Sequence, residues 1–173
     1  MANFTMQRPA VSEYAGHFGK YVDLVPGSDV VGALRGQIGE TLATLGAIGE
    51  ADSLKRYAEG KWSVREVLGH MIDTERIMAY RALRIARADT TPLPGFDQDP
   101  YIAAAGFDAR SWSGLLEEFE VVRRSNVLMF DGWNADAWGR LGIASGNPIS
   151  ARALAFVIAG HELHHMKIVR ERY

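Results

Sequence analysis

The 173-residue sequence contains no cysteine. This absence excludes disulfide bonds, thiolate metal ligands and a cysteine nucleophile. Long hydrophobic runs are missing as well. The longest one, residues 153–160, has eight residues, whereas a membrane-spanning helix needs roughly 20. The N-terminus does not show the basic and then apolar order of a secretory signal. We therefore expect a cytoplasmic protein with no membrane partner.

Neither sign of charge is in excess. The chain has 19 lysines and arginines against 21 acidic residues, a formal net charge of −2. A protein that binds nucleic acid through its whole surface would carry a basic excess, so we expect no nucleic-acid partner. Hydrophobic residues make up 47% of the chain, which is enough to build a sizeable core. The length suits a single domain over residues 1–173.

Helical periodicity dominates the chain after residue 28. Residues 1–27 contain two prolines and little periodicity, and we expect them to form an extended lead-in. Four helices are predicted, beginning near Ser28, Ser63, Ser111 and Ser150. Ser63 and Glu66 form a capping-box pattern, and Ser150 is a good N-cap residue. The last helix should run to about Arg172.

These four helices, with no convincing strand pattern, predict an all-α four-helix bundle. The second connection has about 22 residues, and at ~3.3 Å per residue it is long enough to travel the length of a helix. It could make the second and third helices parallel, which gives an up-down-down-up topology. A stripe of small residues on the first helix, which permits a close helix contact within the chain or between two copies, consists of Gly32, Gly36, Gly39, Ala43 and Gly46.

Histidines are the residues most suited to chemistry in this chain. His161 and His165 lie one helical turn apart, the spacing at which two imidazoles can bind one metal ion. Both lie on or beside the apolar stripe of the last helix, and His70 lies on an inward line of the second helix. A single buried histidine is usually a hydrogen-bonded core residue. Three inward histidines need partners, because each unpaired one costs ~1–3 kcal/mol, and a shared metal would satisfy all of them.

Several alternatives accompany this metal hypothesis. Residues 161–165, HELHH, also match the HExxH pattern of zinc proteases, but the sequence shows no sheet-bearing domain of the kind that such proteases use. Glu162 could support a metal ligand, act as a base or be a solvated surface charge. Asp97 and Asp99 lie in the long connection, where the rim of a site often lies, and we favour solvated loop acids for both.

Three segments carry a resemblance to a known family: residues 61–76, KWSVREVLGHMIDTER; residues 92–99, PLPGFDQD; and residues 160–165, GHELHH. With them, the chain from about residue 61 to 173 resembles the DinB-like (DinB/YfiT) family of bacterial metal-binding helical bundles. The resemblance implies an up-down-down-up bundle, often a homodimer, with a three-histidine site for a divalent ion such as nickel or zinc. His70, His161 and His165 take the ligand positions, whereas His164 matches none.

The resemblance also bears on activity. Family members with assigned activities are thiol-dependent transferases, metal-dependent hydrolases or isomerases. We therefore predict a metal-dependent enzyme for a small-molecule substrate, either a transferase that uses a low-molecular-weight thiol or a hydrolase, and assign no catalytic residue beyond the ligands. The alternative is a non-enzymatic helical dimer or ligand-binding module with no catalytic metal, in which core hydrogen bonds satisfy the histidines.

Overall fold

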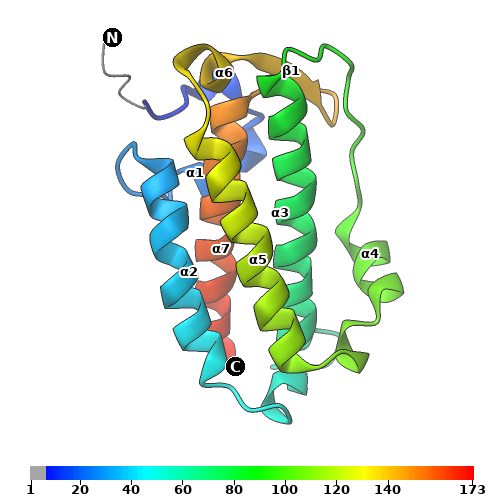
Figure 1. Ribbon diagram of the computed structural model, residues 1–173. Coiled ribbons are helices and arrows are strands. Elements are labelled where there is room, and N and C mark those ends of the chain that lie inside the picture. The colour runs from blue at the N-terminus through cyan, green and yellow to red at the C-terminus, as the bar shows by residue number, and fades with distance from the viewer. Residues whose placement is uncertain (1–6) are drawn as a thin grey trace.

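A computed structural model describes residues 7–173, and its main body is a bundle of four long helices (Figure 1). Each helix begins within two residues of the predicted serine, and the last one ends at the predicted Arg172. The four helices are α2 (Val30–Gly46), α3 (Val64–Ala86), α5 (Trp112–Asp131) and α7 (Ala151–Arg172).

Side-chain caps explain why the helices begin where they do. The Ser63 hydroxyl accepts a hydrogen bond from the Glu66 backbone N–H at 3.0 Å, and the Glu66 carboxylate accepts one from the Ser63 N–H at 2.8 Å. This is the predicted capping box, which satisfies two N–H groups that the helix itself cannot pair. Ser111 and Ser150 also accept from the backbone of their helices. The predicted caps are therefore confirmed.

The bundle has the predicted up-down-down-up topology. In Figure 1, α2 and α7 run down the page whereas α3 and α5 run up, so α3 and α5 are parallel and α3 is antiparallel to α7. The connection between α3 and α5 descends the full length of the bundle. It contains α4 (Gln98–Ala105) and the 3-10 turn η4 (Phe107–Ala109). Because α3 and α7 are antiparallel, the first half of α3 lies alongside the last half of α7.

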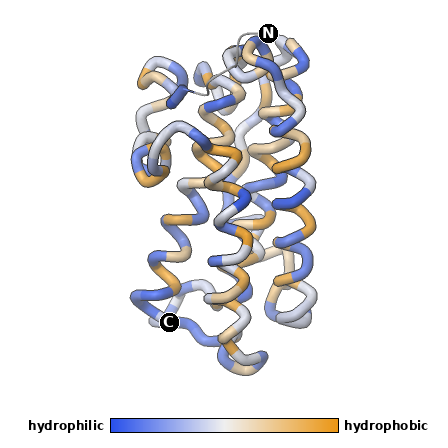
Figure 2. The backbone as a smooth tube through the Cα atoms, turned by 60° about the vertical axis from the view of Figure 1, so that its left-hand side comes forward, coloured by the Kyte–Doolittle hydropathy of each residue, from blue (hydrophilic) through white to orange (hydrophobic). Residues whose placement is uncertain are grey.

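Two apolar clusters fill the bundle, and a polar layer lies between them. One cluster includes Leu34, Ala82 and Leu154, and the other includes Leu68, Leu115 and Val169. Figure 2 shows hydrophobic and hydrophilic residues interleaved along each helix. Between the clusters, all four helices contribute buried polar residues: Gln37 and Thr41 from α2, His70, Thr74 and Glu75 from α3, Arg123 from α5, and His161 and Glu162 from α7.

The N-terminal segment differs from the expected extended lead-in. Residues 1–6 lie outside the described part of the chain. The remainder turns back on itself, because the Arg8 guanidinium donates to the carbonyls of Val22 and Gly27 at 2.9 and 2.8 Å. These contacts join positions far apart in the sequence, so periodicity did not reveal them. The segment forms three short turns: η1 (Val11–Glu13), η2 (Gly16–Phe18) and α1 (Gly19–Val22).

A β-hairpin before the last helix was not predicted. Its strands are β1 (Leu141–Ala144) and β2 (Asn147–Ser150), antiparallel with Leu141 opposite Ser150, and the short helix α6 (Ala135–Gly139) precedes them. Ser145 and Gly146 both have positive φ, at 51° and 76°, as a tight two-residue hairpin turn requires. The strands are too short for an alternating pattern to appear in the sequence.

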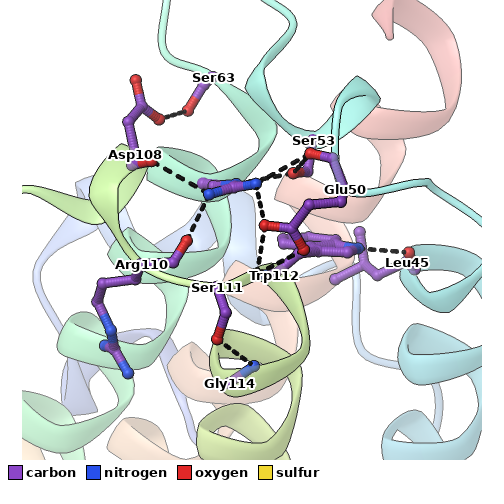
Figure 3. Close-up of polar contacts among 10 residues, drawn as sticks. Leu45, Glu50, Ser53, Ser63, Asp108, Arg110, Ser111, Trp112 and Gly114 are labelled. Atoms are coloured by element: carbon purple, nitrogen blue, oxygen red, sulfur yellow. Dashed lines mark hydrogen bonds and ion pairs between the residues drawn. The ribbon is translucent and has the colours of Figure 1, made fainter.

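A buried arginine organises the lower end of the bundle. Arg65 donates to the Ser53 hydroxyl at 2.8 Å and to the Asp108 carbonyl at 3.1 Å, and it pairs with the Glu50 carboxylate. Figure 3 shows these acceptors converging from the connections on either side of α3. Ser53 belongs to the 3-10 turn η3 (Asp52–Leu54). The contacts hold the beginning of α3 against both neighbouring connections.

The glycines of the small-residue stripe on α2 make no close contact with another helix in the described residues 7–173. A Cβ added at Gly36, Gly39 or Gly46 would meet no atom within 4 Å, and one added at Gly32 would meet only the capping residue Asp29. Among residues 7–173, no helix is long and apolar enough to cross a membrane.

Candidate metal centre

Three histidines converge where α3 and α7 pass through the polar layer. The Nε2 atom of His161 lies 3.0 Å from Nε2 of His70 and 3.1 Å from Nε2 of His165. One ring nitrogen from each residue lies within 4.8 Å of the other two. His70 and His161 are 4% and 5% exposed, and His165 is half-buried. These three residues are the ones that their positions in the sequence predicted, and the structure brings them together as the histidine triad.

Close packing around α7 holds the triad in place. Gly160 allows α1 to approach, because a Cβ at this position would lie 2.0 Å from the Tyr21 carbonyl oxygen. The Tyr21 ring then stands edge-on to His161, with 5.3 Å between ring centroids. On the other side, the Trp62 ring lies 4.9 Å from the His70 ring. Aromatic rings therefore pack against two of the three histidines.

Burial keeps the three imidazoles neutral. It lowers the pKa of His70 to about 4, and together with the neighbouring rings it lowers that of His165 to about 3. The pKa of His161 falls well below its ordinary value, first because of burial and then because of its histidine neighbours. A metal ligand must be a neutral imidazole, since protonation occupies the lone pair that binds the ion. Near neutral pH, the triad therefore offers three available nitrogen donors.

The contacts of the triad fit a shared ion better than a hydrogen-bonded core. Within residues 7–173, no carboxylate or carbonyl pairs with these rings; the Thr74 hydroxyl, 3.5 Å from Nδ1 of His70, is the nearest polar partner outside the triad. The two short nitrogen separations are close to the ~3.3 Å expected between two ligands of a tetrahedral ion with Zn–N bonds of ~2.0 Å. The donor set consists of neutral nitrogens, which zinc and nickel both accept.

Two cavities flank the triad. The larger, of about 430 Å³, is lined by His70 and His161 together with residues of α1, α3 and the long connection. The smaller, of about 300 Å³, is lined by His165, Trp62 and the C-terminal Tyr173. Asp99 lines both cavities. A ligand in either cavity would therefore reach the triad.

A buried ion network lies directly behind the triad, and sequence reasoning did not find it. Arg123 donates to both carboxylate oxygens of Glu75 at 2.8 Å and pairs with Glu162. Burial opposes the charge on Arg123, but these two carboxylates outweigh it and hold its pKa above the ordinary value. Thr41 donates to Glu162, and Asn126 donates to Glu75 at 3.0 Å. The sequence places these charged residues on the apolar faces of their helices, but their pairing depends on the packing of four helices.

The remaining candidate residues take different places. Glu162 is 2% exposed and paired with Arg123, so the surface-charge interpretation is wrong for this residue. His164 is half-buried and lies outside the triad, as its position predicted. Asp97 is exposed and caps α4 by accepting from the Asp99 N–H at 3.2 Å. Asp99 lies in the first turn of α4 rather than in a loop, and both acids are exposed and line the larger cavity.

Fold and site together define a helical bundle that carries three converging histidines where two antiparallel helices meet. The chain belongs to the DinB superfamily, whose sequence model matches residues 33–169. A curated relative from Oceanobacillus iheyensis, provisionally named a metal-dependent hydrolase, is 33% identical over 66 residues. That match covers 38% of this chain. The chain spans only 36% of the relative's length.

Two solved structures resemble the fold. YfiT from Bacillus subtilis, described as a probable metal-dependent hydrolase with an unusual four-helix bundle topology, superposes with a TM-score of 0.69 at 16% identity. The match covers 96% of this chain and 91% of YfiT. A mycothiol-dependent maleylpyruvate isomerase matches with a TM-score of 0.67 at 14% identity, over 84% of this chain and 61% of the isomerase. At these identities, the likeness concerns the fold.

Proposed function

We propose that this protein is a metal-dependent hydrolase in which His70, His161 and His165 hold one divalent ion. The observation that carries the proposal is the convergence of three neutral ring nitrogens that, within residues 7–173, have no partner outside the triad. The names of the Oceanobacillus relative and of YfiT, both metal-dependent hydrolases, support this class. An ion bound by three imidazoles keeps an open coordination position and supplies Lewis-acid chemistry there.

The chain's own residues supply the rest of the site. The packing of α3 against α7 orients the three imidazoles before an ion arrives, which limits the ordering needed on binding. The ring of Tyr21 packs against His161, and that of Trp62 packs against His70. The larger cavity leaves room for a small-molecule substrate beside His70 and His161.

A thiol-dependent transferase is the second candidate function. The presence of two cavities around one triad favours it, because two reactants could approach the same ion from different sides. The mycothiol-dependent isomerase supports a low-molecular-weight thiol as one of these reactants. Turnover of activated esters and electrophiles, measured with and without such a thiol, separates the two functions: a hydrolase needs no thiol, whereas a transferase is inactive without it.

Metal analysis tests the ligand assignment. Protein purified without an affinity tag, so that no nickel comes from a resin, should contain or take up about one divalent ion per chain by elemental analysis. His165→Ala should lose that ion, because two histidines remain and the third donor is gone. His164→Ala is the matched control, since it removes the neighbouring imidazole from the same helix and should keep the ion. Full occupancy in His165→Ala, or no uptake by the unaltered chain, would refute the proposal.

The same elemental analysis identifies the metal, for which nickel and zinc are the expected candidates.

The homodimer implied by the family resemblance also stays a prediction. It is supported by the open small-residue face of α2 at Gly36, Gly39 and Gly46. Light scattering during size-exclusion chromatography should give twice the 19.1 kDa mass of the chain, and a single-chain mass would contradict the dimer.

A further inference from the structure

The larger cavity contains a buried cation that the proposed metal site does not use. Arg81 is 3% exposed, lies on α3 and lines this cavity with His70, Thr74 and Met78 of the same helix. These positions recur at helical spacing, so one face of α3 forms a continuous wall from the triad to Arg81. Arg81 is therefore a component of the same site.

Within residues 7–173, every hydrogen-bond partner of Arg81 is neutral. Its Nη2 donates to the Pro94 carbonyl at 2.5 Å and to the Ser145 hydroxyl at 3.2 Å, and Nη1 lies 3.6 Å from the Met78 sulfur. The guanidinium also lies over the Phe96 ring, 5.6 Å from its centroid. Within the described chain, no carboxylate forms an ion pair with this arginine. A buried charge is costly unless it is paired, so the arrangement holds an unneutralised cation at the wall of a cavity.

The other buried arginines of residues 7–173 show the contrast. Arg65 pairs with Glu50, and Arg123 pairs with Glu75 and Glu162. Carboxylates hold the pKa of Arg123 above its ordinary value, whereas burial lowers the pKa of Arg81. The fold thus supplies an acid to two of its three buried guanidinium groups. For the third, the missing acid can come from a ligand.

The position of Arg81 sets the shape of such a ligand. His70 and Arg81 are 11 residues apart on one helix, which is about 16 Å along its axis. Because side chains tilt toward the N-terminus of their helix, Arg81 extends back toward the triad. Lys20 adds an exposed cation to the cavity lining, while Asp97 and Asp99 are exposed acids. The negative end of a ligand is therefore favoured at the buried Arg81 and disfavoured beside the two acids.

We propose that Arg81 binds a carboxylate group of the substrate while the reacting end of the substrate lies at the histidine triad. The Nη2 hydrogens are used by Pro94 and Ser145, which holds the guanidinium still before the ligand arrives, and the N–H groups of Nη1 and Nε are left to donate charge-assisted hydrogen bonds to a carboxylate. The part of this proposal that concerns the reacting end of the substrate rests on the proposed function. The anion site itself does not require a metal.

Binding of succinate to the EDTA-treated chain tests the anion site without any contribution from an ion at the triad. An NMR titration should show saturable binding of succinate and none of succinamide, its neutral diamide. Arg81→Met should raise the dissociation constant at least tenfold, because charge-assisted hydrogen bonding to the carboxylate is lost. Arg84→Met is the matched control: Arg84 lies on the same helix, pairs with Asp89 and does not line the cavity, so binding should be unchanged.

A purely structural role for Arg81 predicts a different result. Arg81→Met would then lower the melting temperature and leave succinate binding as it was. If Arg81→Met does not fold, two other measurements decide. Arg81→Lys should bind succinate more weakly than the unaltered chain, and the side-chain N–H signal of Arg81 in the unaltered chain should shift with succinate but not with succinamide. Three results would overturn the proposal. They are equal binding of succinate and succinamide, an Arg81 signal that does not move, and a site at which Arg81 binds inorganic phosphate but not succinate.

Metal content separates this inference from the proposed function. Arg81 is not a ligand, so Arg81→Met should take up as much metal as the unaltered chain. A chain that binds succinate through Arg81 but takes up no metal would refute the metal site and leave the anion site standing. A chain that takes up metal but shows no Arg81-dependent succinate binding would refute the anion site and leave the metal site standing.

Discussion

Replacing Arg123 with methionine tests whether the buried ion network stabilises the bundle. The side chain of methionine fills much of the same space but carries no charge. The change leaves the carboxylates of Glu75 and Glu162, which are 3% and 2% exposed, without their cation. Glu162 would keep only its bond from Thr41, and Glu75 only its bond from Asn126.

The expected loss is large, because breaking a buried ion pair costs ~3–5 kcal/mol when the remaining charge has no partner. For a chain of this length, each 1 kcal/mol corresponds to ~2–4 °C in Tm, which gives a decrease of about 6–20 °C. Urea unfolding and a thermal melt at pH 7 would measure both quantities. Arg35→Met is the control: Arg35 pairs with Asp131 at the surface, both are more than half exposed, and the loss should be under ~1 kcal/mol.

A triple variant, Arg123→Met with Glu75→Gln and Glu162→Gln, isolates the cause. It removes the two uncompensated charges, so it should recover a substantial part of the stability that the single variant loses. The reasoning is refuted if Arg123→Met loses no more stability than Arg35→Met. It is also refuted if the triple variant is no more stable than Arg123→Met, because the loss would then come from packing.

Two further predictions concern pH and close packing. The free energy of unfolding of the metal-free protein should fall as pH falls from 6.5 toward 4, because the unfolded chain binds protons before His70 (pKa about 4) and His165 (pKa about 3) do. The slope approaches ~1.4 kcal/mol per pH unit for each histidine, and a flat urea midpoint over this range would contradict it. Gly160→Ala should lower stability by ~1–3 kcal/mol, because its Cβ would lie 2.0 Å from the Tyr21 carbonyl oxygen. Gly36→Ala meets no atom within 4 Å and should be neutral or stabilising by up to ~1 kcal/mol, so equal Tm changes in the two variants would argue against the close approach of α1.

Features that depend on local physics were predictable from the sequence. Ser63 and Ser150 begin helices because their hydroxyls accept backbone N–H groups that lie three residues away in the same chain segment. His161 and His165 share a face because one helical turn separates them. The length of the second connection allowed the crossover, and the antiparallel arrangement of α3 and α7 then placed His70 at the same level as the pair on α7.

Features that join distant segments were not predictable in the same way. The hairpin of β1 and β2 is too short to show alternation, and its turn depends on positive φ at Ser145 and Gly146. Glu162 looked equally suited to the surface or the interior. Its burial follows from the position of Arg123, which lies 39 residues earlier on another helix. A sequence shows that a charged residue falls on an apolar face, but not which opposite charge meets it there.

The amino-acid sequence by itself determined four helices, their caps and the faces on which the three histidines lie, because periodicity and capping are properties of neighbouring residues. Only the tertiary structure decided that Arg123 lies between two carboxylates whereas Arg81 lines a cavity and, within residues 7–173, pairs with no carboxylate. The two arginines are similar in sequence terms, since each falls on the buried side of a helix. Which partners surround a buried charge depends on the heights and rotations of all the packed helices, and these are set by contacts across the whole bundle.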